Sequence, residues 1–410
     1  MAERIIVGID PGSSKVAVLV AATDSEGSLS LLAATQAPSA GLRQGVVVNM
    51  EETVSAIIAA LDRAEHLSGQ KITSAFVSLA GRHLSATNTR GTATITPGGR
   101  EIIFQDMSHA IEAARTGLQL GENREIIHQL PRGYIVDEQS GVPNPIGMAG
   151  FKLEVETHIV TAGTTTIQNL TKCVHAAQVE LDGFVSAPIA AGGAVLTPAE
   201  REMGAMVVDL GAGTTSVAIF ADGSPWLTGE LPGGGSAITR GIATELRLPL
   251  DVAEQLKLTY GHCDPQDVAE DDLIELDELS LILPRSDLAG VIQAEARELV
   301  TELRLPLQQA QQAGVRPLGI VLTGGTAALP GLTELVERTL GLPARVGPPR
   351  GVRGMGDGLG TTAYATAAGL LLWGAQRGAG GALVAAGAGG HGPFGHMWSF
   401  LRRATQVFLP

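Results

Sequence analysis

Two aspartates, Asp10 and Asp209, each follow an apolar run and come just before a glycine-containing turn. The first stretch reads IIVGIDPGSSKVAVLV at 5 to 20, and the second reads VVDLGAGTTSVAIF at 207 to 220. Alternating apolar residues resume after each turn, which predicts a β-hairpin rather than the strand-to-helix turn of a Walker or dinucleotide-binding loop. The N–H groups of such glycine turns can bind an anion, and phosphate is the obvious candidate.

The repetition of this hairpin predicts a duplicated lobe, with both turns facing one cleft. Carboxylates repel a polyphosphate, so we expect Asp10 and Asp209 to hold Mg²⁺, which bridges the phosphate oxygens. Lys15 adds a positive charge beside the first turn. A P-loop is excluded because neither turn contains Gly-Lys-Ser/Thr.

Three further stretches have both a functional and a purely structural interpretation. Gly233 to Gly235 precede a helix that begins near Ala237; its free N–H groups could bind phosphate, or the glycines could form a plain tight turn. Glu254 and Lys257 lie three apart on a predicted helix, where a surface ion pair is the simpler interpretation. The Gly324-Gly325 pair could lie against a nucleotide base or form an ordinary strand-to-helix loop.

Length and composition limit the possible functions. With 410 residues, of which 44% are hydrophobic, the chain is long enough for two or more domains with substantial cores. A formal net charge of -14 disfavours general nucleic-acid binding, so we expect no nucleic-acid partner. Cys173 and Cys263 lack the spacing of metal ligands, which indicates buried free thiols in a reducing cytoplasm. The N-terminal residues do not have the pattern of a secretory signal.

The remaining periodicity predicts alternating helices and strands around a small inserted domain at 82–162. Residues 264–280 lack Lys and Arg and are expected to form an acidic linker that contains a strand. We expect strands over 29–37 and 72–81, and helices over 50–67, 106–116, 165–181, 186–197, 251–260 and 363–373.

The C-terminal residues are typical of a tethered membrane anchor. Residues 376–393 are rich in glycine and alanine, which predicts a flexible linker, and residues 394–410 have the spacing of a short amphipathic helix. This helix could lie in a membrane surface or dock on its own core, and its aromatic and basic residues favour the membrane. Its apolar face contains Phe394, Met397, Trp398, Leu401 and Phe408, with Arg402 and Arg403 at the polar margin.

The order of these motifs resembles the actin, Hsp70 and sugar-kinase superfamily. More narrowly, the chain resembles the bacterial cell-division protein FtsA family, from residue 1 to about 375. The similar stretches are LRQGVVVNM at 42–50, FVSLAGRHLSATNTRG at 76–91, REIIHQLPRGYIVD at 124–137 and NPIGMAGFKLEVETHIV at 144–160. The last two lie in the inserted domain peculiar to that family, which makes them more specific than the phosphate turns.

The resemblance implies a two-lobed α/β fold of the actin and Hsp70 type, with a duplicated ATP-binding core and an inserted small α+β domain. Its subdomains would be 1A at 1–81, 163–196 and 358–375, 1C at 82–162, 2A at 197–240 and 315–357, and 2B at 241–314. A linker and an amphipathic helix would follow.

The resemblance also implies which residues bind ATP and Mg²⁺. Glu254 and Lys257 would flank the ribose and base, in place of the surface pair considered above, and Gly324 and Gly325 would lie behind the adenine. Asp10 and Asp209 would lie near the metal. The phosphates would contact Gly12, Ser13, Ser14, Lys15, Gly211, Gly213, Thr214, Thr215, Gly234 and Gly235.

A member of this family would polymerise, bind the C-terminal tail of FtsZ through 241–314, anchor FtsZ to the cytoplasmic face of the membrane at the division site and recruit later division proteins. Arg285 is our candidate for a contact to the acidic tail. Ala187 replaces an acidic residue that often precedes the Pro-x-Ala-Ala helix in relatives, so ATP hydrolysis should be slow or absent. Pro11 removes one N–H from the first phosphate turn, which weakens the expected nucleotide affinity.

Two alternatives remain open at this stage. One is an ATP-dependent small-molecule kinase of the same superfamily, which would need a general base that the sequence does not place. The other is an actin-like adaptor of pilus assembly, against which the motifs of the inserted domain argue.

Overall fold

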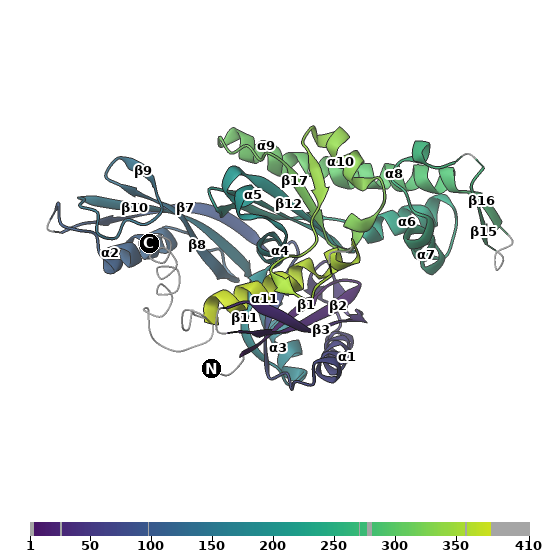
Figure 1. Ribbon diagram of the computed structural model, residues 1–410, viewed down its shortest axis with the longest axis horizontal. Coiled ribbons are helices and arrows are strands. Elements are labelled where there is room, and N and C mark those ends of the chain that lie inside the picture. Colours follow the sequence, from purple (N-terminus) through teal and green to yellow (C-terminus); the bar gives the residue numbers. More distant parts are fainter. Residues whose placement is uncertain are drawn as a thin grey trace.

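The computed structural model describes residues 4–24, 27–96, 98–269, 271–276, 281–356 and 359–378. Two lobes, each built on a mixed β-sheet, lie one above the other in Figure 1, with smaller elements extending to both sides. This arrangement confirms the expected two-lobed α/β fold.

The two sheets have the same order of five strands. In the first sheet these strands lie in the order β3-β2-β1-β6-β11, with β19 as a sixth strand beside β3, and in the second they lie in the order β14-β13-β12-β17-β18. In each sheet, the three strands that come first in the sequence are antiparallel neighbours. Two later strands extend the sheet in parallel on the other side of the first strand, β1 or β12. The strands of the first sheet are β1 (Arg4–Pro11), β2 (Lys15–Thr23), β3 (Leu29–Pro38), β6 (Ser74–Leu79), β11 (Glu180–Ser186) and β19 (Val352–Arg353). Those of the second are β12 (Ala205–Leu210), β13 (Thr214–Ala221), β14 (Ser224–Pro232), β17 (Ile320–Thr323) and β18 (Ala344–Val346).

Two helices, α4 (Ala187–Val195) and α11 (Ala365–Gly378), pack between the two sheets, and α11 is the yellow helix across the centre of Figure 1. Their small side chains join one apolar cluster with Leu19 of the first sheet and Val207 and Phe220 of the second. Because residues of both lobes share this core, the lobes are joined by packing as well as by the chain.

The outer faces of the sheets are covered by separate helices. On the first sheet these are α1 (Met50–Ser68) and α3 (Thr164–Ala176). The Asn49 side chain caps α1 by accepting from the Glu52 N–H, and Gly69 ends it at φ 65°, which glycine adopts without strain. The helices associated with the second sheet are α5 (Pro198–Met203), α6 (Gly235–Glu245), α7 (Leu250–Tyr260), α8 (Arg285–Glu302), α9 (Arg304–Gln312) and α10 (Leu332–Leu340).

The inserted domain forms its own sheet in the order β7-β10-β8-β9, with helix α2 packed on one face, at the left of Figure 1. Its core includes Met107, Tyr134 and Leu153. The chain enters it after β6 and leaves it into α3, so both connections are to the first lobe. Its elements are β7 (Ser85–Thr94), α2 (Phe104–Thr116), β8 (Arg124–Val136), β9 (Gln139–Val142) and β10 (Lys152–Gly163).

The smaller elements complete the described part of the chain. The 264–280 segment includes a short helix and the first strand of a hairpin, at the right of Figure 1. These elements are η1 (Pro265–Asp267), β15 (Leu273–Leu276) and β16 (Leu281–Pro284). The others are β4 (Leu42–Arg43), β5 (Val46–Val47), η3 (Gly325–Ala328) and η4 (Leu359–Tyr364).

One predicted helix needs correction. The helix expected over 165–181 ends at Ala176, because Glu180 to Ser186 pair in parallel with β6 as the edge strand β11. The Gly324-Gly325 loop continues as a 3₁₀ turn, and the helix that follows it begins at Leu332. The linker and anchor expected at 376–393 and 394–410 lie outside the described residues, except for the end of α11.

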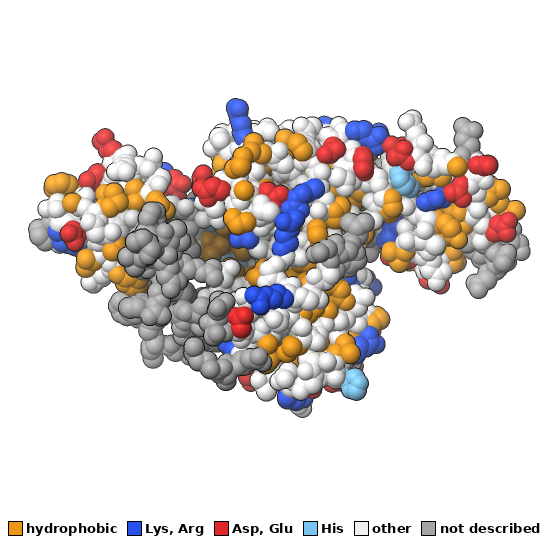
Figure 2. All heavy atoms as spheres, in the orientation of Figure 1, with side chains coloured by type: hydrophobic (Ala, Val, Ile, Leu, Met, Phe, Trp, Pro, Cys, Tyr) orange, Lys and Arg blue, Asp and Glu red, His pale blue; other side chains and the backbone are white. Residues whose placement is uncertain are grey.

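Acidic and basic side chains are interspersed on the face of the molecule drawn in Figure 2. No helix in the described ranges is long and apolar enough to cross a membrane.

The contact between α4 and α11 generates a prediction. A Cβ on Gly369 would lie 1.9 Å from the Ala190 carbonyl oxygen, so Gly369→Ala must push the helices apart. We expect a loss of about 1–3 kcal/mol of stability, measured by chemical denaturation. Gly193→Ala, on α4 with open space around its Cβ position, is the matched control and should be neutral or slightly stabilising. Equal effects of the two changes would contradict close packing here.

Candidate functional site

The two aspartate-headed turns have the same backbone geometry. The Gly12 N–H donates to the Lys15 carbonyl at 2.9 Å, and the Gly211 N–H donates to the Thr214 carbonyl at 3.0 Å. A Cβ on Gly12 or Gly211 would lie about as close to the same carbonyl oxygens, so each turn needs glycine at this position. The expected duplication of the hairpin is therefore seen in its hydrogen bonds.

The turns meet across the space between the lobes. A Cβ on Gly213 would lie 2.5 Å from the Ser13 Oγ, so the second turn lies directly against the first. The same Ser13 hydroxyl oxygen accepts the Gln44 N–H at 3.1 Å. Both turns thus lie at the boundary between the lobes, which is where the sequence predicts the nucleotide cleft.

A hydroxyl group fixes each aspartate, from the same lobe for Asp10 and from α11, which belongs to the first lobe, for Asp209. Ser78 of β6 donates to Asp10 Oδ1 at 2.5 Å, and Thr366 of α11 donates to Asp209 Oδ2 at 2.6 Å. Burial raises the pKa of both carboxyls, that of Asp209 to about 6, where the charge of Asp10 adds to the shift. Two poorly solvated carboxylates thus lie near each other in the cleft.

Lys15 is the cation that acts on both aspartates. Burial lowers the pKa of Lys15, while the charges of Asp10 and Asp209 oppose that change. Its ammonium lies 5.4 Å from the centre of the Tyr364 ring, within cation–π range. Lys15 therefore offsets part of the negative charge that would otherwise repel an anion.

The chemistry of these donors fits Mg²⁺ better than a metal held by protein alone. The described ranges contain no group of three or more His, Cys, Asp or Glu residues that could hold an ion. Mg²⁺ usually keeps several waters and binds through one or two carboxylates together with substrate phosphates. Asp10 and Asp209 supply two such carboxylates at the turns.

The helix start after Gly233 to Gly235 differs from the expectation of free N–H groups. The Gly235 and Ser236 N–H groups donate to the carbonyls of Gly211 and Ala212, both at 2.9 Å. Those donors hold the second turn in place, so the prediction that they are free is wrong. The Gly234 backbone also packs against Ala212, so these glycines still line the turn.

Lys257 and Glu254 form more than a surface ion pair. The Lys257 ammonium is buried and donates to Glu254 Oε2 at 2.6 Å, to Thr239 Oγ1 at 2.9 Å and to the Gly235 carbonyl at 3.1 Å. The simpler surface interpretation is therefore wrong for Lys257, and the pair lies next to the helix start that supports the second turn.

The Gly324-Gly325 loop lies against the same turn. A Cβ on Gly324, whose φ is 86°, would lie 2.4 Å from Asp209 Oδ1, and the neighbouring Thr326 hydroxyl donates to the Gly211 carbonyl at 3.2 Å. A Cβ on Gly235 would lie 2.5 Å from that Thr326 hydroxyl oxygen and 3.4 Å from the Lys257 ammonium. The loop, the helix start and the Lys257 cluster therefore converge.

The predicted site residues thus separate into three groups. The first group forms one contiguous region, which consists of the two turns together with Gly234, Gly235, Glu254, Lys257, Gly324 and Gly325. Thr214 and Thr215 begin β13, and the Thr215 hydroxyl is bonded to the Gly233 carbonyl at 3.1 Å. Arg285 lies outside this region and pairs with Asp272 at 2.9 Å, and the membrane-anchor residues fall outside the described ranges.

Sequence reasoning missed Ser78 and Thr366, the two hydroxyl residues that orient the aspartates. Both lie in apolar stretches far along the chain from their partners. Only the parallel pairing of β1 with β6 and the docking of α11 bring them to the site.

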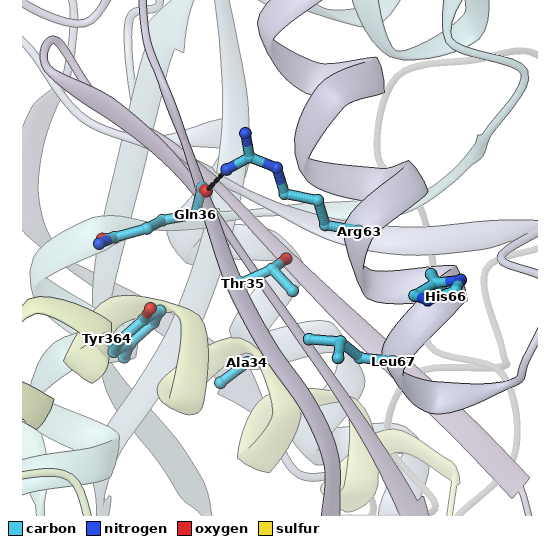
Figure 3. Close-up of a pocket in the computed structure, with 7 residues that line it drawn as sticks. All are labelled: Ala34, Thr35, Gln36, Arg63, His66, Leu67 and Tyr364. Atoms are coloured by element: carbon cyan, nitrogen blue, oxygen red, sulfur yellow. Dashed lines mark hydrogen bonds between the residues drawn. The ribbon is translucent and has the colours of Figure 1, made fainter.

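A separate pocket of about 380 Å³ lies on the first lobe between β3 and α1 (Figure 3). Arg63 of α1 reaches across it to donate to the Gln36 carbonyl at 2.7 Å. Tyr364 lines the pocket, but none of the phosphate-turn residues does. The pocket is therefore distinct from the cleft between the turns.

Comparison with known proteins identifies the family. Over about nine-tenths of both chains, this chain is 36% identical to cell division protein FtsA of Pseudomonas aeruginosa and 31% identical to that of Escherichia coli. The chain belongs to the FtsA family of cell-division proteins. Family models described as cell division protein FtsA and as the SHS2 domain inserted in FtsA match residues 206–369 and 81–161.

Solved structures with low sequence identity share the fold. A PilM-PilN type IV pilus biogenesis complex aligns with a TM-score of 0.67 at 18% identity, covering 91% of this chain and 99% of the other. MreB5 of Spiroplasma citri bound to ADP aligns with a TM-score of 0.50 at 14% identity, covering 89% and 94%. These similarities establish the actin-like fold of this FtsA-family chain.

The raised pKa of Asp209 generates a prediction about stability. Folding raises this pKa from 3.8 to about 6, so the folded protein binds the proton more tightly than the unfolded chain does. The resulting stabilisation is complete below about pH 4 and is lost as the pH rises through about 6. Without divalent cations, Asp209→Asn should raise the free energy of unfolding by about 1–3 kcal/mol at about pH 7.5 and by little near pH 4.

Denaturant titrations across this pH range would measure the effect. Asp222→Asn, at an exposed turn position of the same lobe, is the matched control and should show no such pH-dependent gain. If Asp209→Asn destabilises the protein at every pH, the carboxylate is stabilised by the fold, which contradicts the raised pKa.

Proposed function

We propose that this FtsA-family chain binds ATP with Mg²⁺ between its lobes, polymerises, and anchors FtsZ to the cytoplasmic face of the membrane at the division site. The observation that carries the nucleotide part is the convergence of two aspartate-headed glycine turns on one cleft. Family membership supports the cell-division part. Polymerisation and recruitment of later division proteins follow the family resemblance.

The contacts within the cleft support one orientation of ATP. The phosphates would lie between the turns at Gly12 to Lys15 and Gly211 to Thr215, with Mg²⁺ near Asp10 and Asp209. Glu254 and Lys257 would contact the ribose and base, and Gly324 and Gly325 would lie behind the adenine. The aligned MreB5 structure, which contains ADP, provides independent support for a nucleotide in this fold.

The domain boundaries remain part of the proposal. We assign 1A to 1–81, 163–196 and 358–375, 1C to 82–162, 2A to 197–240 and 315–357, and 2B to 241–314. The separate cores of the inserted domain and of the two sheets support these divisions.

The family match does not favour the two alternatives. A small-molecule kinase or a pilus-assembly adaptor would share the fold, as the PilM-PilN complex does. The similarity to FtsA relatives covers about nine-tenths of the chain, including the inserted domain. We therefore propose at most slow ATPase activity in a scaffold protein.

Membrane attachment is proposed from the sequence of residues 394–410. Phe394, Met397, Trp398, Leu401 and Phe408 would enter the interface of an anionic membrane, with Arg402 and Arg403 near the headgroups. One short helix binds weakly, so attachment would depend on many anchors in one polymer, with ATP acting through assembly.

Co-flotation with anionic vesicles tests this proposal. We expect the full chain to float, with a larger bound fraction in the presence of ATP, and a chain ending at Gly392 to stay in solution. Trp398→Glu should reduce binding to the level of the shortened chain, because it places a charge at the apolar interface, whereas Gln406→Glu is a control for the added charge. Flotation of the shortened chain would contradict the anchor.

The FtsZ tail would dock on a basic groove formed largely by 241–314. This groove, about 450 Å³ in volume, is lined by Arg297, Arg304 and Arg338 together with several polar groups. Arg338 pairs with Asp264 at 2.8 Å, whereas the Arg297 side chain forms no ion pair within the described ranges. Arg297 is thus available to an acidic peptide.

Arg285, our candidate from the sequence, has a different environment. Its guanidinium pairs with Asp272 and donates to the Tyr260 carbonyl at 2.8 Å, which ties the hairpin region to α7. An acidic tail would have to compete with these contacts, so we assign it a smaller contribution than Arg297.

Binding of a fluorescent FtsZ C-terminal peptide tests the groove. We expect Arg297→Glu to weaken binding about tenfold, which corresponds to about 1.4 kcal/mol. Arg316→Glu makes the same charge change at an exposed position outside the groove and should have little effect. If Arg285→Ala weakens binding while Arg297→Glu does not, the hairpin region is the docking site and the groove is not.

A further inference from the structure

Three polar residues form a row across neighbouring strands of the second sheet. Asp209 of β12 pairs with Ser216 of β13, and Ser216 pairs with Glu230 of β14. Residues directly opposite each other in antiparallel strands point to the same face of the sheet. Glu230 therefore lies on the same face as the Asp209 carboxylate.

The Glu230 carboxyl is only partly satisfied by hydrogen bonds. Ser216 Oγ donates to Oε2 at 2.9 Å, while Oε1 is shielded from solvent and accepts no hydrogen bond of ordinary geometry from the residues that the structure describes. A buried acceptor without a partner is costly, and in a cleft it is available to a proton or a ligand.

Glu230 lies where the two phosphate turns meet. It is close enough to the Gly81 N–H for that group to favour its charged form. A Cβ on Gly81 would lie 2.4 Å from the Gln44 carbonyl oxygen, and the Gln44 N–H bonds to Ser13, which touches Gly213. These contacts connect Glu230, through Gly81 and Gln44, to the point where Ser13 of the first turn meets Gly213 of the second, which is where we propose that the terminal phosphate lies.

We propose that Glu230 is a catalytic residue of ATP hydrolysis, in which Oε1 accepts the proton of the attacking water. The proposal rests on the proposed ATP site. The water oxygen forms a bond to the γ-phosphorus, and the bond from that phosphorus to the bridging oxygen breaks, leaving its electron pair on ADP. The water proton goes to Oε1 and is later released to solvent.

The position of Glu230 accounts for the absence of an acidic residue before Pro188. Ala187 is buried at the start of α4 and can hold no water by hydrogen bonding from its side chain. Glu230 reaches the same cleft from β14 instead. From Ala187 alone, ATP hydrolysis was expected to be slow or absent. With Glu230 as the base, we expect slow hydrolysis that depends on this residue.

The environment also predicts how this activity varies with pH. Burial, with a smaller effect of the Asp209 charge, raises the pKa of Glu230 to about 8, while Ser216 and Gly81 oppose the change. Strands β8 and β10, packed against β14, carry Arg132 and His158. The base is mostly protonated at neutral pH, so the hydrolysis rate should rise with pH through about 8.

Single-turnover hydrolysis and ATP binding should be measured separately on the full chain, from about pH 6 to about pH 9. We expect Glu230→Gln to lower the rate about 100-fold and to remove the rise with pH, while the Kd for a fluorescent ATP analogue changes less than about twofold. Glu230→Asp should retain part of the rise. Glu202→Gln, an exposed change in the same lobe, should behave like the unmodified chain.

The outcomes separate this inference from the proposed function. Binding of ATP without hydrolysis, or an unchanged rate in Glu230→Gln, overturns the role of Glu230 and leaves the ATP site standing. Equal loss of binding and hydrolysis in Glu230→Gln makes the residue a binding contact and also overturns it. Absence of ATP binding by the unmodified chain overturns both.

Discussion

The interlobe cleft holds two carboxylates and one ammonium group away from most of the solvent, and the rest of the fold depends on how these charges are held. Lys15 acts on Asp10 and Asp209, but burial still raises the pKa of both carboxyls. Such an arrangement persists only because the surrounding structure supplies hydroxyl donors and a shared apolar core. The remaining negative charge is what would favour the Mg²⁺ and phosphate that we propose to bind there.

The duplicated sheets explain how the charges reach one another. Each turn follows the central strand of its sheet. The hydroxyl that orients Asp10 comes from the neighbouring parallel strand β6, and the one that orients Asp209 comes from α11, which packs between the sheets. Helices α4 and α11 then fix the distance between the sheets through small residues such as Gly369 and Ala190. A larger side chain at this contact would move one turn relative to the other, so packing far from the cleft controls the geometry within it.

Local patterns sufficed to predict the hairpins, the inserted domain and most helices, because strand alternation and glycine turns are local properties. The helix expected over 165–181 was too long because pairing of β11 with β6 is a long-range interaction. For the same reason, the sequence could not show that Ser78 and Thr366 hold the aspartates or that Lys257 is buried. The Gly235 and Ser236 donors were misassigned because their acceptors are more than twenty residues away.

Strand β14 connects the cleft to the inserted domain. His158 of β10 bonds to the Thr228 hydroxyl at 3.0 Å and to Asn88 at 2.7 Å, and Asn88 donates to the Trp226 carbonyl at 2.9 Å. Burial, with the nearby charge of Arg132, lowers the pKa of His158 to about 4, so the ring is neutral at physiological pH. The inserted domain is covalently joined to the first lobe but bonded here to the second. Separation of the lobes must therefore either move this domain or break these hydrogen bonds, which ties the state of the cleft to the orientation of the inserted domain.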